Sequence, residues 1–183
     1  MDLIFFDLDG TLLNSESEIS NFTKETLVKL QENSIAYSAA TGRTMLTGTS
    51  ILDGYGFELP QIYSNGVTIW DPRAYSLTLE HLLSALEVSV IMQAADLQGI
   101  TPFVHAVDES DYFIYHANPR HDIEKELISA RYQITKARIM PLNQLSSRSQ
   151  VTNISMIGVA AAVEEIQMEL NKNNNLVTYL SMW

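Results

Sequence analysis

The chain opens with Leu3-Ile4-Phe5-Phe6-Asp7-Leu8-Asp9-Gly10-Thr11-Leu12-Leu13, and this stretch decides the fold. Residues 3–6 predict a short buried strand, because an uninterrupted apolar run ends there at an Asp-Gly turn signal. Residues two apart in an extended segment point the same way, so Asp7 and Asp9 can face one reacting group. Paired carboxylates beside a buried strand cost stability unless a cation binds them. The stretch therefore predicts a functional site, whereas a lone Asp-Gly would indicate only a turn.

Two later strands are expected to end in polar residues as well. The strand expected at 35–40 leads into Thr41-Gly42-Arg43, and the strand expected at 61–64 leads into Asn65-Gly66. The helices expected between the strands cover residues 21–32 and 43–52. This β-α-β-α-β order is typical of a parallel, doubly wound sheet, whose ligands bind at the carboxyl ends of the strands. All three polar segments are therefore expected at one edge of one sheet.

After residue 66 the pattern changes to hairpins that alternate with helices. The expected strands cover residues 67–70, 75–79, 101–107, 112–116, 151–157 and 176–182, and the expected helices cover residues 82–97, 119–132 and 160–171. Hairpins that follow a parallel core indicate a second domain of α+β type. We therefore assign residues 1–66 to the core and residues 67–183 to a cap domain.

The composition of the chain excludes several classes of partner and of chemistry. A net charge of −11 argues against a nucleic-acid or anionic-membrane partner, because such partners need clustered Lys and Arg. No apolar run approaches the ~20 residues of a membrane span, and the start of the chain lacks the basic region of a signal peptide. The 183 residues contain no cysteine, which excludes disulfides, thiolate nucleophiles and thiolate zinc sites. We expect a cytoplasmic protein.

The three polar segments resemble motifs of the haloacid dehalogenase (HAD) superfamily. Residues 3–12 are similar to its first motif, hydrophobic-Asp-x-Asp-Gly-Thr-Leu, and residues 35–43 are similar to its second, a strand that ends in Thr-Gly-Arg. Residues 61–69 resemble the strand-Asn-Gly-hairpin through which Cof-type members (subclass IIB) enter a large cap. The resemblance covers essentially the whole chain. It implies an α/β fold, with a HAD-like (Rossmannoid) parallel core and an α+β cap.

The resemblance also implies a chemistry, the hydrolysis of small phosphorylated metabolites such as sugar phosphates or cofactor phosphates. Asp7 would be the nucleophile that forms an acyl phosphate, and Asp9 would be the general acid and base. Thr41 and Gly42 would bind the transferring phosphoryl group. Mg²⁺ would be held by Asp7 and by the backbone carbonyl of Asp9.

Three assignments stay open at this point. Residues 41–43 also suit a plain strand-to-helix turn, with Thr41 as an N-cap. Arg43 would either bind phosphate in a bidentate manner or clamp the cap. Asn65 is either an ordinary turn residue or a contact of the substrate.

Two histidines fall on one face of the second expected hairpin. Simple alternation places His105 and His116 there together with Phe103, Val107 and Ile114. They would either meet the substrate or be partly solvated residues of the cap, and we expect the latter.

Two family motifs do not occur in the 183 residues. Members continue after the cap with a lysine motif and then an acidic Gly-Asp-x-x-Asn-Asp motif, and neither string follows here. We therefore expect a core that is incomplete in its C-terminal half, weak Mg²⁺ binding and little or no turnover by residues 1–183. The rival hypothesis is a truncated, inactive chain, or half of a split enzyme, that binds phosphate compounds without turnover.

The missing acidic motif has a further consequence for the first strand. In the family, the strand of that motif pairs with the first strand, so residues 3–8 are expected to present an unpaired, apolar edge. Such edges recruit other strands. We expect a homo-oligomer formed through this edge, or a cap element folded over it.

Overall fold

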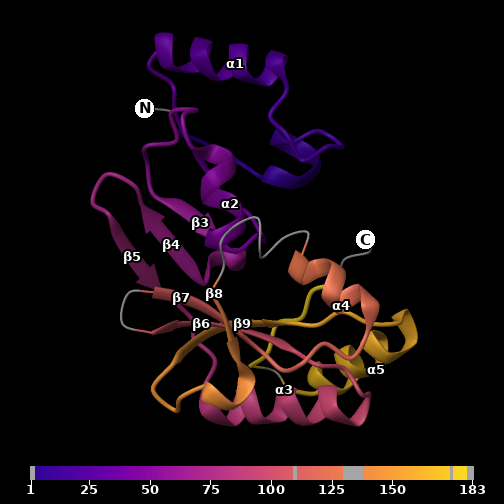
Figure 1. Ribbon diagram of the computed structural model, residues 1–183. Coiled ribbons are helices and arrows are strands. Elements are labelled where there is room, and N and C mark those ends of the chain that lie inside the picture. Colours follow the sequence, from indigo (N-terminus) through magenta and orange to yellow (C-terminus); the bar gives the residue numbers. More distant parts are fainter. Residues whose placement is uncertain (1–2, 109–110, 130–137, 174, 181–183) are drawn as a thin grey trace. The chain divides into compact units, whose positions relative to one another are not determined.

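The computed structural model describes residues 3–108, 111–129, 138–173 and 175–180 (Figure 1). The chain forms two compact units, Met1–His81 and Leu82–Trp183. Each unit has its own sheet and its own buried core. In the part of the chain that the structure describes, no helix is both long enough and apolar enough to span a membrane.

The first unit contains the predicted parallel core. Strand β1 (Leu3–Phe6) pairs in parallel with β2 (Ala36–Ala39), and Leu3 lies opposite Ala36. Strand β3 (Gln61–Tyr63) joins this pair through a parallel bridge between Ala40 and Ile62. The connecting helices are α1 (Asn21–Glu32) and α2 (Met45–Leu52). Because all three strands run the same way, their carboxyl ends lie at one edge, as the sequence predicts.

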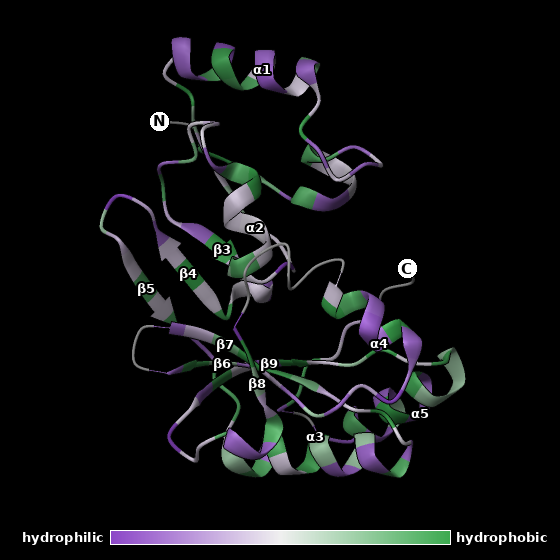
Figure 2. Ribbon diagram, viewed as in Figure 1, coloured by the Kyte–Doolittle hydropathy of each residue, from purple (hydrophilic) through white to green (hydrophobic). Residues whose placement is uncertain are grey.

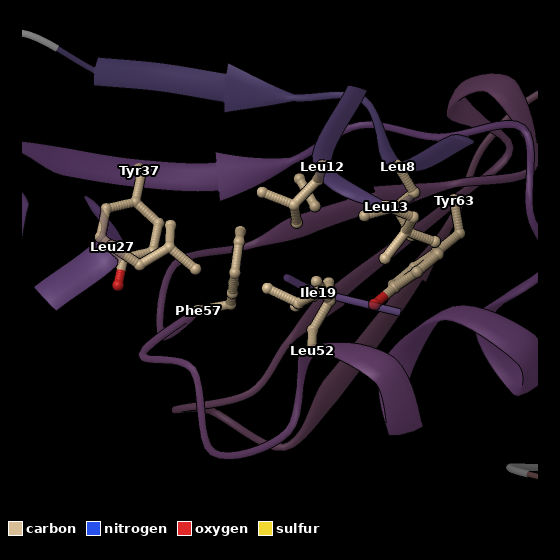
Figure 3. Close-up of a cluster of buried hydrophobic side chains, with 10 residues drawn as sticks. Leu8, Leu12, Leu13, Ile19, Leu27, Tyr37, Leu52, Phe57 and Tyr63 are labelled. Carbon is tan, nitrogen blue, oxygen red and sulfur yellow. The ribbon is translucent and has the colours of Figure 1, made fainter. Parts of the chain in front are cut away.

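Leucines anchor the turn that follows β1. Leu8, Leu12 and Leu13 are buried, and they belong to a cluster of apolar side chains that Figure 3 shows together with residues from α1, α2 and β3. The chain closes a single π-type turn here, in which the Leu13 N–H donates to the Leu8 carbonyl at 2.9 Å. Burying Leu8 between two exposed aspartates keeps both carboxylates on the solvent side of the turn.

A hairpin follows the parallel core within the first unit. Strands β4 (Thr68–Asp71) and β5 (Ser76–Leu79) extend β3 into an antiparallel sheet of order β3-β4-β5. The compact units are divided after His81, so this hairpin lies in the first of them. The assignment of residues 67–183 to a cap stays a prediction.

The second unit is a four-stranded sheet with helices. Its strands are β6 (Phe103–Asp108), β7 (Asp111–His116), β8 (Arg138–Pro141) and β9 (Gln150–Ser155), in the order β8-β7-β6-β9. Its helices are α3 (Ala85–Leu97), α4 (Asp122–Leu127) and α5 (Ala160–Leu170).

Helices α3 and α5 lie together along one face of this sheet (Figure 1). Apolar and polar bands alternate along α3 in Figure 2, and its apolar side buries Ile91 and Ala94 against Ile166 of α5. The start of α3 is fixed by a capping box, in which Ser84 Oγ accepts from the Glu87 N–H and Glu87 Oε2 accepts from the Ser84 N–H.

Three elements of the second unit differ from the prediction or remain open. Strand β8 was not predicted, because its four residues end in proline and border a polar segment. The strand predicted at 176–182 is wrong for residues 176–180, which form neither helix nor strand, since no neighbouring strand pairs with them in the described structure. Residues 181–182 lie outside the described residues, as do residues 130–132 of the helix predicted at 119–132.

The predicted shared face of β6 and β7 is present, but its histidines are buried. His105 lies opposite Ile114 in the antiparallel register, and only 1% of its surface is exposed. His116 stacks on Phe103, with ring centroids 3.8 Å apart, and its Nδ1 donates to the Pro102 carbonyl at 3.0 Å. The expectation that both are partly solvated is therefore wrong, because each ring finds packing and a polar partner inside the unit.

The buried His105 makes stability depend on pH. Burial lowers the pKa of His105 from 6.5 to about 4, so the unfolded chain binds its proton more readily than the folded chain does. The contribution of His105 is fully present above pH 6.5 and is lost as the pH falls toward 4. Urea unfolding should show about 2 kcal/mol less stability at pH 5 than at pH 7.5 from this residue. A His105→Gln variant should lack that part of the slope, and an identical slope in both proteins would contradict the assignment.

Helix α2 approaches β3 closely at Gly48. A Cβ atom there would lie 2.4 Å from Cε1 of the fully buried Tyr63 ring. We expect Gly48→Ala to lower the free energy of unfolding by about 1–3 kcal/mol, because overpacking outweighs the higher helix propensity of alanine. Ser50→Ala is a matched control on an exposed position of α2 and should change stability by less than about 0.5 kcal/mol. Equal urea midpoints for both variants would contradict the close contact.

The second edge of β1 has no strand partner among the described residues. Leu3 and Phe5, on the outward side of the strand, are 49% and 50% exposed. Self-association through this edge stays a prediction, and Phe5→Lys should raise the monomer fraction in light scattering because an edge lysine opposes strand addition. Phe22→Lys makes the same change at an exposed position of α1 and should leave association unchanged. A monomeric parent chain would contradict the prediction.

Candidate active site

A pocket of about 490 Å³ lies in the first unit where the three parallel strands end. Its walls come from the segments that follow β1, β2 and β3, and they consist of Asp7, Ala40, Thr41, Gly42, Ile62, Asn65 and Gly66. Four of the predicted site residues, Asp7, Thr41, Gly42 and Asn65, therefore share one pocket. Asp9 and Arg43 do not line it.

Asp7 leaves β1 with an exposed side chain that is already hydrogen bonded at one oxygen. Its Oδ1 accepts from the Leu8 N–H at 2.8 Å, while its own carbonyl accepts from the Leu12 N–H at 3.2 Å. Both donors belong to buried leucines, so the packing of the turn fixes the direction of the carboxylate. Oδ2 takes no part in this bond.

Thr41 is buried and connects the second loop to the third. Its Oγ1 accepts from the Arg43 N–H at 3.1 Å, which is a local turn bond. The N-cap of α2 is Thr44, so the alternative of Thr41 as an N-cap is wrong. Its carbonyl accepts from the Asn65 N–H at 3.2 Å, and the Arg43 carbonyl accepts from the Ser64 N–H at 2.8 Å. The loops after β2 and β3 are therefore held together by their backbones.

The third loop has an unusual backbone. Ser64, Asn65 and Gly66 all have positive φ, at 49°, 55° and 99°. Asparagine and glycine tolerate this region, but a serine there costs on the order of 1 kcal/mol or more. The Ser64 hydroxyl is buried without a hydrogen-bond partner among the described residues. Ser64 was not singled out from the sequence, in which only the Asn-Gly pair signalled a turn.

Gly42 and Asn65 touch each other across the pocket wall. A Cβ atom on Gly42 would lie 3.1 Å from Asn65 Oδ1, which is closer than most Cβ contacts. A glycine at position 42 therefore lets the Asn65 amide lie against the loop. This places the amide beside the backbone N–H groups of the Thr-Gly-Arg turn.

Arg43 forms an ion pair with Asp9. Its Nε donates to Asp9 Oδ2 at 2.8 Å and its Nη2 donates to Asp9 Oδ1 at 2.6 Å, so the guanidinium is paired with the predicted acid and base. Nη2 also lies 3.4 Å from Ser17 Oγ, a residue that the sequence did not suggest. The hydrogen bond with Asp9 raises the pKa of Arg43, which keeps the guanidinium charged.

The donors near Asp7 suit a hard cation with few protein ligands. Among the residues that the structure describes, no group of three or more His, Cys, Asp or Glu side chains gathers to hold a metal. Both carboxylate oxygens of Asp9 accept from Arg43, so Asp9 is left with its backbone carbonyl for this purpose. Mg²⁺ needs only one or two carboxylates because it retains several waters. The residues therefore fit Mg²⁺, with the Asp7 carboxylate as the principal protein ligand.

Residues 4–183 match the family model of haloacid dehalogenase-like hydrolases, and the chain belongs to this family. It is 28% identical over 170 residues to the HMP-PP phosphatase of Citrobacter koseri, in an alignment that covers 93% of this chain. The chain spans 59% of the length of that relative. The family assignment made from the three motifs is confirmed.

The fold is shared with solved members of the family. A haloacid dehalogenase-like hydrolase from Bacteroides thetaiotaomicron superposes with a TM-score of 0.76 at 24% identity, covering 99% of this chain and 68% of that one. A HAD subclass IIB sugar phosphatase gives a TM-score of 0.70 at 19% identity, covering 93% of this chain and 64% of that one. The predicted α/β, HAD-like fold is therefore confirmed.

Proposed function

We propose that this chain carries the nucleophile-bearing part of a phosphatase site for small phosphorylated compounds. The observation that supports it is the pocket that unites Asp7 with Thr41, Gly42 and Asn65 at the carboxyl edge of the sheet. A carboxylate for attack, and a hydroxyl, a turn N–H group and an amide for orientation, are what a phosphoryl group requires. The similarity to an HMP-PP phosphatase and to a sugar phosphatase favours a phosphorylated metabolite or cofactor as the substrate class.

The proposed reaction has two steps. The Asp7 carboxylate attacks phosphorus, the bond from phosphorus to the leaving oxygen breaks, and Asp9 in its protonated form gives the leaving oxygen a proton. Asp9 then takes a proton from the water that attacks the acyl phosphate, which releases inorganic phosphate and restores Asp7. Bound Mg²⁺ would neutralise negative charge on the phosphoryl oxygens beside Asp7.

Three residues orient the phosphoryl group in this proposal. The Thr41 hydroxyl accepts from the Arg43 N–H, which leaves its own proton for a phosphoryl oxygen. The turn contributes the backbone N–H of Gly42, and the Asn65 amide lies against the same glycine. Asn65 is thereby proposed as a substrate contact as well as a turn residue.

A second candidate function is phosphate binding without turnover. One observation favours it, since the Arg43 guanidinium is paired with Asp9, the proposed acid and base. A phosphoryl-transfer site that loses one preorganised positive charge commonly loses a factor on the order of 10² or more in rate. The positive charge of Arg43 is already neutralised by Asp9. We therefore propose that residues 1–183 alone turn over little or no substrate.

The role of Asp7 can be tested through binding and through turnover. Calorimetry with inorganic phosphate should show tighter binding in Mg²⁺ than without it, and Asp7→Asn should lose that gain, on the order of tenfold or about 1.4 kcal/mol. Asp53→Asn changes an exposed aspartate at the end of α2 and should behave like the parent chain.

A measurement of phosphate release from an aryl phosphate distinguishes turnover from phosphate binding without turnover. A rate no higher than that of Asp7→Asn would favour binding alone. Metal-dependent hydrolysis that Asp7→Asn abolishes would show turnover and contradict the proposed impairment. The absence of any phosphate binding by the parent chain would remove both candidates.

A further inference from the structure

We infer that Arg43 acts on a bound phosphate through Asp9, as the counter-ion and positioning residue of that carboxylate, and does not itself bind the phosphate. The inference rests on the proposed phosphate site, and it goes beyond that proposal by assigning a role to an arginine next to the pocket. It also replaces both uses of Arg43 that the sequence left open.

The ion pair with Asp9 uses one edge of the Arg43 guanidinium. Nε and Nη2 form one edge of the group, and they donate separately to Oδ2 and Oδ1 of Asp9, at 2.8 and 2.6 Å. This two-pronged arrangement is the one by which arginine binds phosphate, so that edge cannot serve both partners at once. Ser17 Oγ, at 3.4 Å from Nη2, adds a third contact on the same side.

The surroundings hold Arg43 more firmly than they hold Asp9. The Arg43 side chain is 17% exposed and the Asp9 side chain 58% exposed. The Arg43 backbone is fixed at both of its polar groups, since its N–H donates to Thr41 Oγ1 and its carbonyl accepts from the Ser64 N–H. An arginine fixed in this way is suited to orienting a more exposed carboxylate.

The pair also decides the charge that an incoming anion meets. Asp9 follows Asp7 by two residues, so an unpaired Asp9 carboxylate would repel phosphate near the pocket. The Arg43 guanidinium cancels this charge at direct hydrogen-bond distance. Removing Arg43 therefore leaves the negative charge of Asp9 uncompensated by Arg43, which should weaken phosphate binding. Neutralising Asp9 leaves the positive charge of Arg43 uncompensated, which should strengthen phosphate binding.

A double-mutant cycle distinguishes this indirect role from direct binding. Binding of inorganic phosphate in Mg²⁺ is measured by calorimetry for the full chain, Arg43→Met, Asp9→Asn and the double variant. We expect Arg43→Met to weaken binding about threefold to fivefold, and Asp9→Asn to tighten it by a similar factor. The double variant should return to within about twofold of the parent chain, because neither uncompensated charge remains.

Direct phosphate binding by Arg43 gives a different pattern. The double variant would then bind as weakly as Arg43→Met alone, because neutralising Asp9 would not replace a lost contact between Arg43 and phosphate. That result would overturn the inference and leave the proposed function intact. No phosphate binding by the parent chain would overturn the proposed function and the inference together.

Two controls guard against effects on folding and on general electrostatics. Arg73→Met breaks a second ion pair of the first unit, between Arg73 and Glu58, whose partners are both about two-thirds exposed. It removes the same charge without touching a pocket residue and should leave phosphate affinity unchanged.

Asp9→Asn keeps the shape of its side chain and tests the inference even if Arg43→Met fails to fold, because unchanged or weaker binding in Asp9→Asn would contradict the inference.

Discussion

The exit from β2 is the connection on which the pocket depends. β2 is the central parallel strand, and the residues that follow it bond to both neighbours. The Ala40 N–H donates to the Phe6 carbonyl at the end of β1, and the Thr41 N–H donates to the Ile62 carbonyl of β3. These two bonds bring three loops to one edge, although their pocket residues Asp7, Thr41 and Asn65 are 34 and then 24 positions apart in the sequence. The side chains of the pocket can meet only because this backbone junction is made.

The loops differ in how the junction holds them. The first is anchored by buried leucines and the second by the hydrogen bond from the Arg43 N–H to Thr41 Oγ1. The third contains a run of left-handed residues that ends at Gly66. Strain of this kind persists only where surrounding contacts over-determine it. Here the contacts are the backbone bonds from residues 64 and 65 to the second loop. Three consecutive residues with left-handed backbone therefore lie at the pocket.

Much of this arrangement could be predicted from local sequence. The Asp-x-Asp turn, the range of α1 and the parallel order follow from apolar periodicity, turn residues and chain order, which act over a few positions. The Arg43–Asp9 pair could not be predicted, because it joins residues 34 positions apart whose meeting depends on the finished sheet. The burial of His105 and the absence of a strand at 176–180 were missed for a related reason. Burial and strand pairing depend on neighbours that alternation within one segment does not reveal.

The hydrogen bond from the Leu8 N–H to Asp7 has an entropic consequence. A free aspartate side chain samples several rotamers, and a ligand that needs one of them must restrict the others on binding. Because folding of the turn has already fixed one oxygen of Asp7, that restriction precedes the arrival of any ligand. The saving for an immobilised side chain is on the order of 0.5–1.5 kcal/mol. The turn thus transfers part of the ordering cost of the pocket from binding to folding.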